Sequence, residues 1–272
     1  MMKRVAAMLA SLLVAGWGAA APTTATLSFL WGNPQDEIVT QPLTLAEGTY
    51  AVFHTTAGDF IVKLFPDKAP KTVENFVGLA TGKKEWTHPI TQVPSSKPLY
   101  NNTAIYRIVK DVEIDGGDPT NKGYGGPGYT LDLEISPDLK FDAPGMLAMA
   151  NSGRDKSNGS RWFITLVPLP DFTGRFTIFG KVIGGLDVVR AISRMPTRRP
   201  LEPLDPTVVN TIDIIEVPQR HQTVATFSEQ NGIRVITVEK EMKGPAEETE
   251  ETSPTVAHET GETSPAAPMK EK

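Results

Sequence analysis

Cysteine is absent from this 272-residue chain. Its absence excludes disulfide bonds, thiolate nucleophiles, cysteine-ligated zinc and a lipid-modified cysteine. Only four histidines occur, at positions 54, 88, 221 and 258, and none has the i, i+4 spacing of a helical zinc motif. We therefore predict no metal site, and expect packing alone to stabilise the folded part.

Long hydrophobic runs are also scarce. The main one, Val5 to Trp17, is about 13 residues long, too short to span a bilayer of about 30 Å as a helix. It follows Lys3 and Arg4 and precedes Gly18-Ala19-Ala20-Ala21, which is the layout of a signal peptide. We expect cleavage near Ala20 or Ala21 and export to the periplasm or the medium, with no membrane span left. An uncleaved anchor is the alternative.

The chain has no excess of basic residues either. The chain has 27 basic and 32 acidic residues, and seven Glu against two Lys fall in residues 244–272. That segment has no aromatic residue, so its composition predicts a disordered acidic tail. The body is left nearly neutral, which argues against nucleic acid as a partner.

The remaining chain divides into a Thr- and Pro-punctuated leader of uncertain order (22–47), a folded domain (48–218) and a C-terminal extension (219–243). Alternating apolar residues from Tyr50 to Phe65, broken at Ala57-Gly58-Asp59, predict a β-hairpin. Pro70 and Gly82 bracket a helical pattern, and a second helix is expected over Leu186–Ile192.

Further short apolar stretches separated by Gly-rich or Pro-rich turns predict a mainly β protein built as a closed antiparallel barrel. These stretches are Thr103–Val109, Gly145–Ala150, Trp162–Leu166, Phe176–Val182 and Val209–Val217.

Five longer segments carry a more specific signal because they occur in one order. They are TTAGDFIVKLFPDKAPKTVENFVGLATG from Thr55, PLYNNTAIYRIV from Pro98, GGDPTNKGYGGPGY from Gly116, GMLAMANSGRDKSNGSRWFI from Gly145 and FGKVIGGLDVV from Phe179. Together they resemble the cyclophilin family of peptidyl-prolyl isomerases, particularly its bacterial members, over roughly residues 48–218. The resemblance implies a closed eight-stranded antiparallel barrel capped by two α-helices, with an external peptide groove. We expect a monomer.

The resemblance also implies that Arg107 is the catalytic residue, because the family's Phe-His-Arg stands here as Ile105-Tyr106-Arg107. Rotation about an X-Pro bond costs ~18–20 kcal/mol because amide resonance must be broken. Guanidinium N–H groups can hold the prolyl carbonyl and favour a pyramidal imide nitrogen in the twisted state. This chemistry needs no covalent step and no cofactor.

The substrate-binding positions that the resemblance implies are Val112, Glu113, Asp115, Ala150, Asn151, Arg161, Phe163, Phe172 and Phe176. Six of them depart from the family pattern. The family's phenylalanine, methionine and glutamine are here Val112, Glu113 and Asp115, and its second glutamine, leucine and histidine are Arg161, Phe172 and Phe176. Loss of a ring at position 112 and gain of two others predict a pocket of altered shape.

Asp115 and Arg161 replace an uncharged pair that the family fold places close together. We hypothesise a salt bridge between them, since a planar guanidinium can meet a carboxylate through two parallel hydrogen bonds. In the alternative, Asp115 pairs with Arg107 and draws it away from substrate.

These features predict a peptidyl-prolyl cis-trans isomerase that acts on X-Pro bonds of exported proteins and assists their folding. Its expected partners are proline-containing segments of unfolded or exported proteins. The alternative is a proline-peptide-binding chaperone or scaffold with weak or no turnover, in which the altered groove has lost catalysis.

Overall fold

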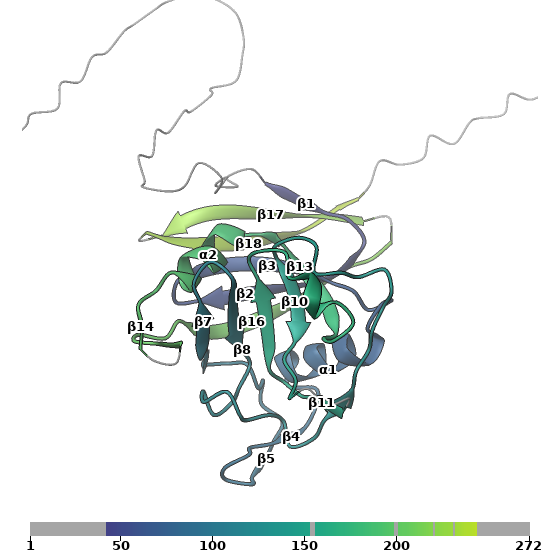
Figure 1. The fold of residues 1–272 in the computed structure, drawn as a ribbon. Helices are drawn as coiled ribbons and strands as arrows, with labels where there is room; N and C mark the ends of the chain where they lie inside the picture. Colours follow the sequence, from purple (N-terminus) through teal and green to yellow (C-terminus); the bar gives the residue numbers. More distant parts are fainter. Residues whose placement is uncertain (1–41, 153–155, 199–200, 220, 231, 244–272) are drawn as a thin grey trace, which may run out of the picture. The chain divides into compact units, whose positions relative to one another are not determined.

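A nine-stranded antiparallel sheet forms the centre of the protein (Figure 1). The structure is a computed structural model that describes residues 42–152, 156–198, 201–219, 221–230 and 232–243. The predicted signal peptide (1–21), the leader up to residue 41 and the acidic tail (244–272) lie outside the described residues.

The strand order of the central sheet is β6-β16-β2-β3-β13-β10-β12-β8-β7. The strands are β2 (Gly48–Thr55), β3 (Gly58–Leu64), β6 (Thr103–Ala104), β7 (Arg107–Val109), β8 (Glu113–Gly116), β10 (Met146–Met149), β12 (Trp162–Thr165), β13 (Ile178–Gly184) and β16 (Val208–Val217). The predicted hairpin of residues 50–65 is thus confirmed as β2 and β3, which pair from Tyr50↔Lys63 to Thr55↔Gly58.

The mainly β class is confirmed, but the prediction of a closed eight-stranded barrel is wrong. The nine strands form a curled sheet whose edge strands, β6 and β7, are not paired with each other. Only Ile105 and Tyr106 separate these strands, so one chain segment serves both edges and cannot form a ladder with itself. Ile105 donates its N–H to the carbonyl of Thr207 at 2.8 Å, and Tyr106 donates its own to the carbonyl of Asp115 at 3.0 Å.

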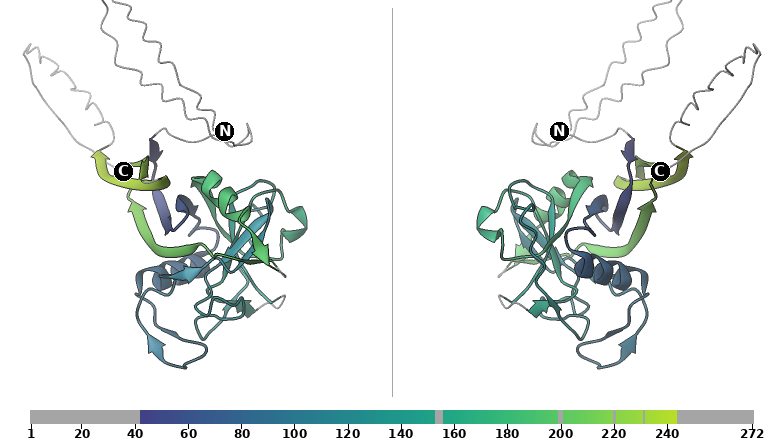
Figure 2. Two further views of the ribbon diagram at one scale, coloured as in Figure 1. Left: turned by 90° about the vertical axis from the view of Figure 1, so that its left-hand side faces the viewer. Right: turned by 90° about the vertical axis from the view of Figure 1, so that its right-hand side faces the viewer.

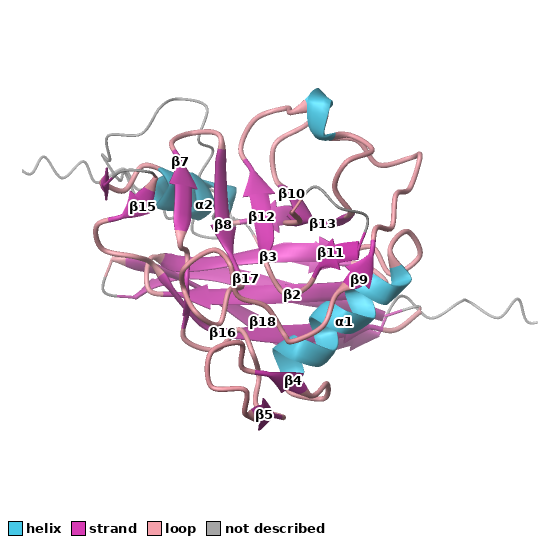
Figure 3. Ribbon diagram, turned by 60° about the horizontal axis from the view of Figure 1, so that its bottom comes forward, coloured by secondary structure: helices cyan, strands magenta, loops and turns pink. Residues whose placement is uncertain are grey.

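Both predicted helices are present, as α1 (Pro70–Thr81) and α2 (Leu186–Ser193). α1 packs against β16, and α2 packs against β3, β7 and β8, so the two helices cover different parts of the sheet (Figure 3). Gly82 ends α1 with φ 73°, and a Cβ there would lie 2.6 Å from the carbonyl oxygen of Ser96. Only glycine fits this helix end. Neither helix of the described residues has the length and apolarity needed to cross a bilayer.

Aromatic rings fill the inside of the curl. The ring centroids of Phe53 and Phe60 lie 4.6 Å apart, and that of Trp162 lies 5.3 Å from Phe53. Trp162, on β12, is fully buried. Because successive strand residues point to opposite faces, its neighbours Arg161 and Phe163 face outward, as the alternation predicts.

A second sheet lies against the outside of the first. It has the order β1-β17-β18 and consists of β1 (Leu43–Leu45), β17 (His221–Gln230) and β18 (Ile233–Lys243). Its inner face joins outer residues of the central sheet in one apolar cluster that includes Leu45, Val52, Ile61, Ala225 and Ile236. Figure 2 shows this sheet, with β17 and β18 in yellow-green, from two sides.

Three short two-stranded pairs complete the described elements, together with a 3-10 helix, η1 (Pro170–Phe172). The pairs are β4 (Trp86–Thr87) with β5 (Pro94–Ser95), β9 (Leu131–Asp132) with β11 (Lys156–Asn158), and β14 (Thr197–Arg198) with β15 (Glu202–Pro203).

Asp59 connects the two sheets through polar contacts. Its carboxylate accepts the backbone N–H of Ile236, on β18, at 2.9 Å and lies 2.8 Å from Nδ1 of His54, on β2. Nε2 of His54 lies 3.5 Å from a carboxylate oxygen of Asp213, on β16. The hydrogen bond to Asp59, opposed by partial burial, raises the pKa of His54 above its ordinary value of 6.5.

We predict that this histidine makes part of the stability pH-dependent. A pKa that is raised in the folded state adds stability that is fully present below pH 6.5 and is lost as pH rises through the folded-state pKa. The free energy of unfolding should therefore differ between wild type and His54→Gln in acid, and the difference should shrink as pH rises through the folded-state pKa of His54. Urea denaturation at several pH values measures this. A difference that is constant or grows with pH would contradict it.

Candidate active site

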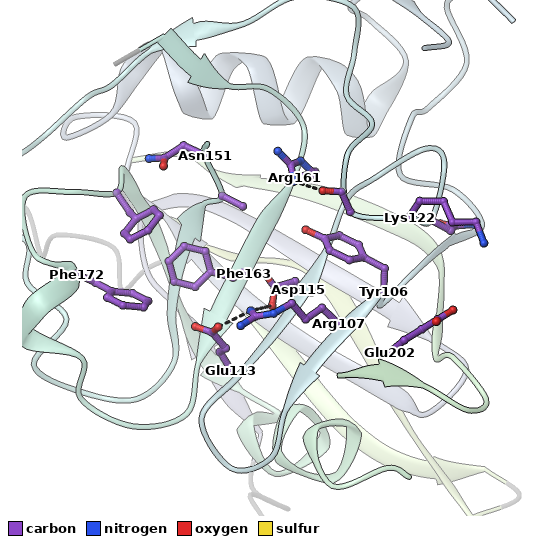
Figure 4. A pocket seen from close by; sticks show the side chains of 14 residues that line it. Tyr106, Arg107, Glu113, Asp115, Lys122, Asn151, Arg161, Phe163, Phe172 and Glu202 are labelled. Carbon is purple, nitrogen blue, oxygen red and sulfur yellow. Dashed lines mark hydrogen bonds and ion pairs between the residues drawn. The ribbon is translucent and has the colours of Figure 1, made fainter. Parts of the chain in front are cut away.

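A pocket of about 590 Å³ opens on the outer face of β7, β8 and β12. Nine of the ten residues singled out from the sequence line it: Arg107, Glu113, Asp115, Ala150, Asn151, Arg161, Phe163, Phe172 and Phe176. Figure 4 shows their side chains gathered on one side of these strands. The tenth, Val112, lies outside the lining. It sits half-buried in the β7–β8 turn, where its N–H bonds the carbonyl of Val109 at 2.9 Å.

Strand register assembles the centre of the pocket. Arg107 pairs with Asp115 across β7 and β8, and Asp115 pairs with Phe163 across β8 and β12. These residues therefore form one row across three neighbouring strands. Because directly opposed side chains lie within contact distance of each other, the row places a guanidinium, a carboxylate and an aromatic ring side by side.

Arg107 is held by two carboxylates. Its Nη1 donates to Oε1 of Glu113 at 2.5 Å and to Oδ2 of Asp115 at 2.7 Å. The Arg107 side chain is 38% exposed, whereas those of Glu113 and Asp115 are 9% and 10% exposed. The guanidinium is thus the most exposed of the three charged groups, and dashed lines in Figure 4 join it to both acids.

The hypothesis of a salt bridge between Asp115 and Arg161 is wrong. Nη1 of Arg161 donates instead to the carbonyl of Gly123, and Asp115 pairs with Arg107, the alternative that the sequence left open. Register explains the difference. Phe163 stands opposite Asp115, and Trp162 stands opposite Gly116, so Arg161 continues the ladder past the end of β8.

The loop that receives Arg161 is organised by Asp118. Its fully buried carboxylate accepts backbone N–H groups from Thr120 and residues 122–125, at 2.5–3.1 Å. Burial by itself would raise the pKa of Asp118, but these donors lower it below its ordinary value. The loop therefore keeps a fixed backbone that presents the Gly123 carbonyl to the pocket.

Five further residues line the pocket but were not assigned to it from the sequence: Tyr106, Asn121, Lys122, Gly123 and Glu202. Tyr106 adjoins Arg107, and residues 121–123 lie in the glycine-rich segment that begins at Gly116, so position beside recognised motifs was the available signal. Glu202, on β15, reaches the pocket through the tertiary fold alone.

Three phenylalanines form an apolar wall beside Arg107. The ring centroid of Phe176 lies 5.2 Å from that of Phe163 and 5.0 Å from that of Phe172. Phe141 is fully buried and stacks on Phe163 at 5.8 Å. Edge-to-face and tilted contacts of this kind hold rings in defined positions. The wall is therefore a preformed surface for a small apolar ring.

Ala150 and Asn151 follow β10 at the rim. The N–H of Ala150 donates to the carbonyl of Arg161 at 3.0 Å, and Nδ2 of Asn151 donates to the carbonyl of Arg175 at 3.0 Å. These bonds tie the rim to β12 and to the segment that carries Phe176.

Burial controls the titration of the groups beneath Arg107. It raises the pKa of Asp115 to about 7, with Arg107 lowering that value and Glu113 raising it further. Burial also raises the pKa of Tyr106. For Arg107, burial lowers the pKa, but the two carboxylates outweigh it and the net change is an increase. Arg107 therefore stays charged.

The pocket thus combines fixed cationic hydrogen-bond donors with an aromatic wall. In the part of the chain that the structure describes, no group of three or more His, Asp or Glu side chains is arranged to hold a metal ion. What the arrangement offers is non-covalent: it can hold a carbonyl at the guanidinium and an apolar ring at the wall.

Comparison with known families decides the relationship. The family model for cyclophilin type peptidyl-prolyl cis-trans isomerase/CLD matches residues 50–216, more than half of the chain. The chain belongs to this family. The match includes all nine strands of the central sheet, except for the first two residues of β2 and the last residue of β16, together with both helices and the whole pocket, but not β1, β17 or β18.

Curated relatives agree with this assignment and carry the same activity in their names. Peptidyl-prolyl cis-trans isomerase B of Streptomyces anulatus is 45% identical over 171 residues, 62% of this chain and 97% of the relative. Peptidyl-prolyl cis-trans isomerase A of Mycobacterium tuberculosis is 43% identical over 181 residues, 66% of this chain and 97% of the relative. The protein is a peptidyl-prolyl cis-trans isomerase of the cyclophilin type.

Solved structures give the same result for the fold. A cyclophilin type peptidyl-prolyl cis-trans isomerase from Cryptosporidium parvum is 32% identical, with a TM-score of 0.55, and the match covers 62% of this chain and 99% of that one. A second crystal structure of it, in the presence of the dipeptide Ala-Pro, is 33% identical, with a TM-score of 0.54, and the match covers 61% and 99%.

We predict that Asp118→Asn destabilises the protein by about 2–4 kcal/mol, because an amide replaces a buried carboxylate that accepts several N–H donors. Urea denaturation measures the loss, and Asp205→Asn at an exposed position is the matched control. Equal stabilities of the two variants would show that Asp118 does not organise the loop.

Proposed function

We propose that Arg107 catalyses rotation about X-Pro bonds in exported polypeptides by binding the twisted imide more tightly than either planar form. The barrier of ~18–20 kcal/mol comes from amide resonance, and each ~1.4 kcal/mol of preferential binding raises the rate tenfold. A fixed guanidinium can supply part of that preference as a charged hydrogen bond.

The observation that carries this proposal is the row of Arg107, Asp115 and Phe163 across three strands. It puts a partly exposed cation in the same pocket as the wall of Phe163, Phe172 and Phe176, with one strand between it and Phe163. In the proposed complex the proline ring packs on this wall, and its carbonyl accepts from Arg107. Ala150 and Asn151 then flank the residue before proline.

The substrate class is supported by a relative. The Cryptosporidium parvum cyclophilin has been crystallised in the presence of Ala-Pro, a dipeptide with the X-Pro bond that we assign to this pocket. The signal-peptide layout of residues 1–21 supports the proposal that the clients are exported proteins and that their folding is assisted outside the cytoplasm.

A second function, proline-peptide binding with little turnover, is favoured by one observation. Nη1 of Arg107 is already occupied by Glu113 and Asp115 at 2.5 and 2.7 Å. If the prolyl carbonyl required Nη1 and could not displace these carboxylates, the pocket would bind the ring without accelerating rotation. The two functions differ in turnover, not in the peptide that is bound.

We predict that Arg107→Ala lowers kcat/KM for an Ala-Pro peptide by about 10²-fold or more, the usual cost of removing a donor aimed at the transition state. Exchange NMR on the free peptide measures the rate, and Lys110→Ala, at an exposed residue of the same hairpin, is the matched control.

Wild-type turnover that survives in folded Arg107→Ala would refute the assigned role of the arginine. Peptide binding without turnover in wild type would favour the binder instead.

A further inference from the structure

Nη1 of Arg107 has no hydrogen left for a substrate. A guanidinium Nη carries two hydrogens, and the two carboxylates take one each, at 2.5 Å for Glu113 and 2.7 Å for Asp115. If the proposed function is right, a prolyl carbonyl that uses this nitrogen must displace one of them. The carboxylates therefore compete with the substrate for Nη1, the nitrogen that lies on their side of the guanidinium.

Charged groups around Asp115 bear on that competition. Asp115 is faced by Arg107 from β7, by Glu113 from β8 itself and by Arg161, the residue before β12, while the phenol of Tyr106 lies close by. Lys122 also lines the pocket, as does Glu202 on β15. Arg161 is directed to the Gly123 carbonyl, so a single guanidinium pairs with both acids. The charge of Glu113 raises the pKa of Asp115, so the two nearly buried carboxylates repel each other, and a proton on Asp115 relieves that repulsion.

We infer that Glu113 and Asp115 are positioning residues for Arg107, and that protonation of Asp115 releases Nη1 to the substrate while ionised Asp115 retains it. This inference rests on the proposed function of Arg107. Glu113 holds the guanidinium in the pocket in both states, and Asp115 sets how firmly Nη1 is occupied.

Asp115 changes its charge near neutral pH, because burial raises its pKa to about 7. Below that pH Asp115 is neutral, so its hydrogen bond to the charged Arg107 loses the Coulomb attraction between opposite charges and becomes weaker. The carbonyl then displaces a weaker competitor. Turnover should consequently rise as pH falls through about 7.

The test is a pH profile of kcat/KM from exchange NMR, which needs no coupling protease, on a blocked Ala-Pro peptide without titratable groups. We expect wild type to be about fivefold more active well below pH 7 than well above it, the factor that corresponds to weakening the competitor by about one net hydrogen bond. Asp115→Asn should be as active as acidic wild type, at every pH. Far-ultraviolet circular dichroism and thermal unfolding confirm that each variant is folded.

Glu113→Gln separates this mechanism from a generic effect of acid. The Glu113 charge contributes to the raised pKa of Asp115, so its removal should move the step to lower pH. His54→Gln should keep the wild-type step, because His54 lies with Asp59 and Asp213 rather than in the pocket.

Turnover that is independent of pH in wild type, or a step that persists in Asp115→Asn, would overturn the inference and leave the proposed function intact. No turnover at any pH would overturn the proposed function instead. Side-chain NMR then decides the inference by itself: the Asp115 carboxyl must titrate near neutrality, and the Arg107 guanidinium resonances must follow it.

Discussion

The burial of Trp162 inside the curled sheet is the constraint on which the pocket depends. Its ring lies 5.3 Å from Phe53, and a Cβ on Gly116 would lie 2.6 Å from it. Because successive side chains of a strand point to opposite faces, Arg161 and Phe163 must then lie on the outer face. A register shift by one residue would bury a guanidinium and expose the indole, so core packing and pocket geometry are fixed together.

The same register explains why Arg107 behaves as it does. The pairing Arg107↔Asp115 puts a carboxylate directly under the guanidinium, and Glu113, two residues earlier on β8, adds another from the same face. Such an arrangement fixes the position of the guanidinium but makes Nη1 less available to the prolyl carbonyl of a substrate. Catalysis by this pocket therefore depends on a balance between holding the arginine and releasing it, and proton uptake at Asp115 is a physical means of shifting that balance.

Local sequence signals were sufficient to predict the elements that depend on neighbouring residues in the chain. Pro70 and Gly82 bracket α1, and the alternation of residues 50–65 predicts the first hairpin, because each depends on neighbours in the chain. The Asp115–Arg161 hypothesis failed because cross-strand register, which no local pattern encodes, decides which acid meets which base. The prediction of a closed barrel was wrong for a similar reason. The edge strands β6 and β7 are separated by two residues only, so they cannot pair with each other, and no local pattern shows this. The pair Asn231-Gly232 is a strong turn signal that could have indicated the β17–β18 hairpin.

The central claim is that Arg107 Nη1 passes from a carboxylate to the prolyl carbonyl. The most direct measurement is a crystal structure of the protein bound to an Ala-Pro peptide below pH 7. We expect Nη1 within about 3.2 Å of the prolyl carbonyl oxygen, the ring against Phe163 and Phe176, and the bond to Asp115 broken. A bound peptide with Nη1 still on both carboxylates would contradict it.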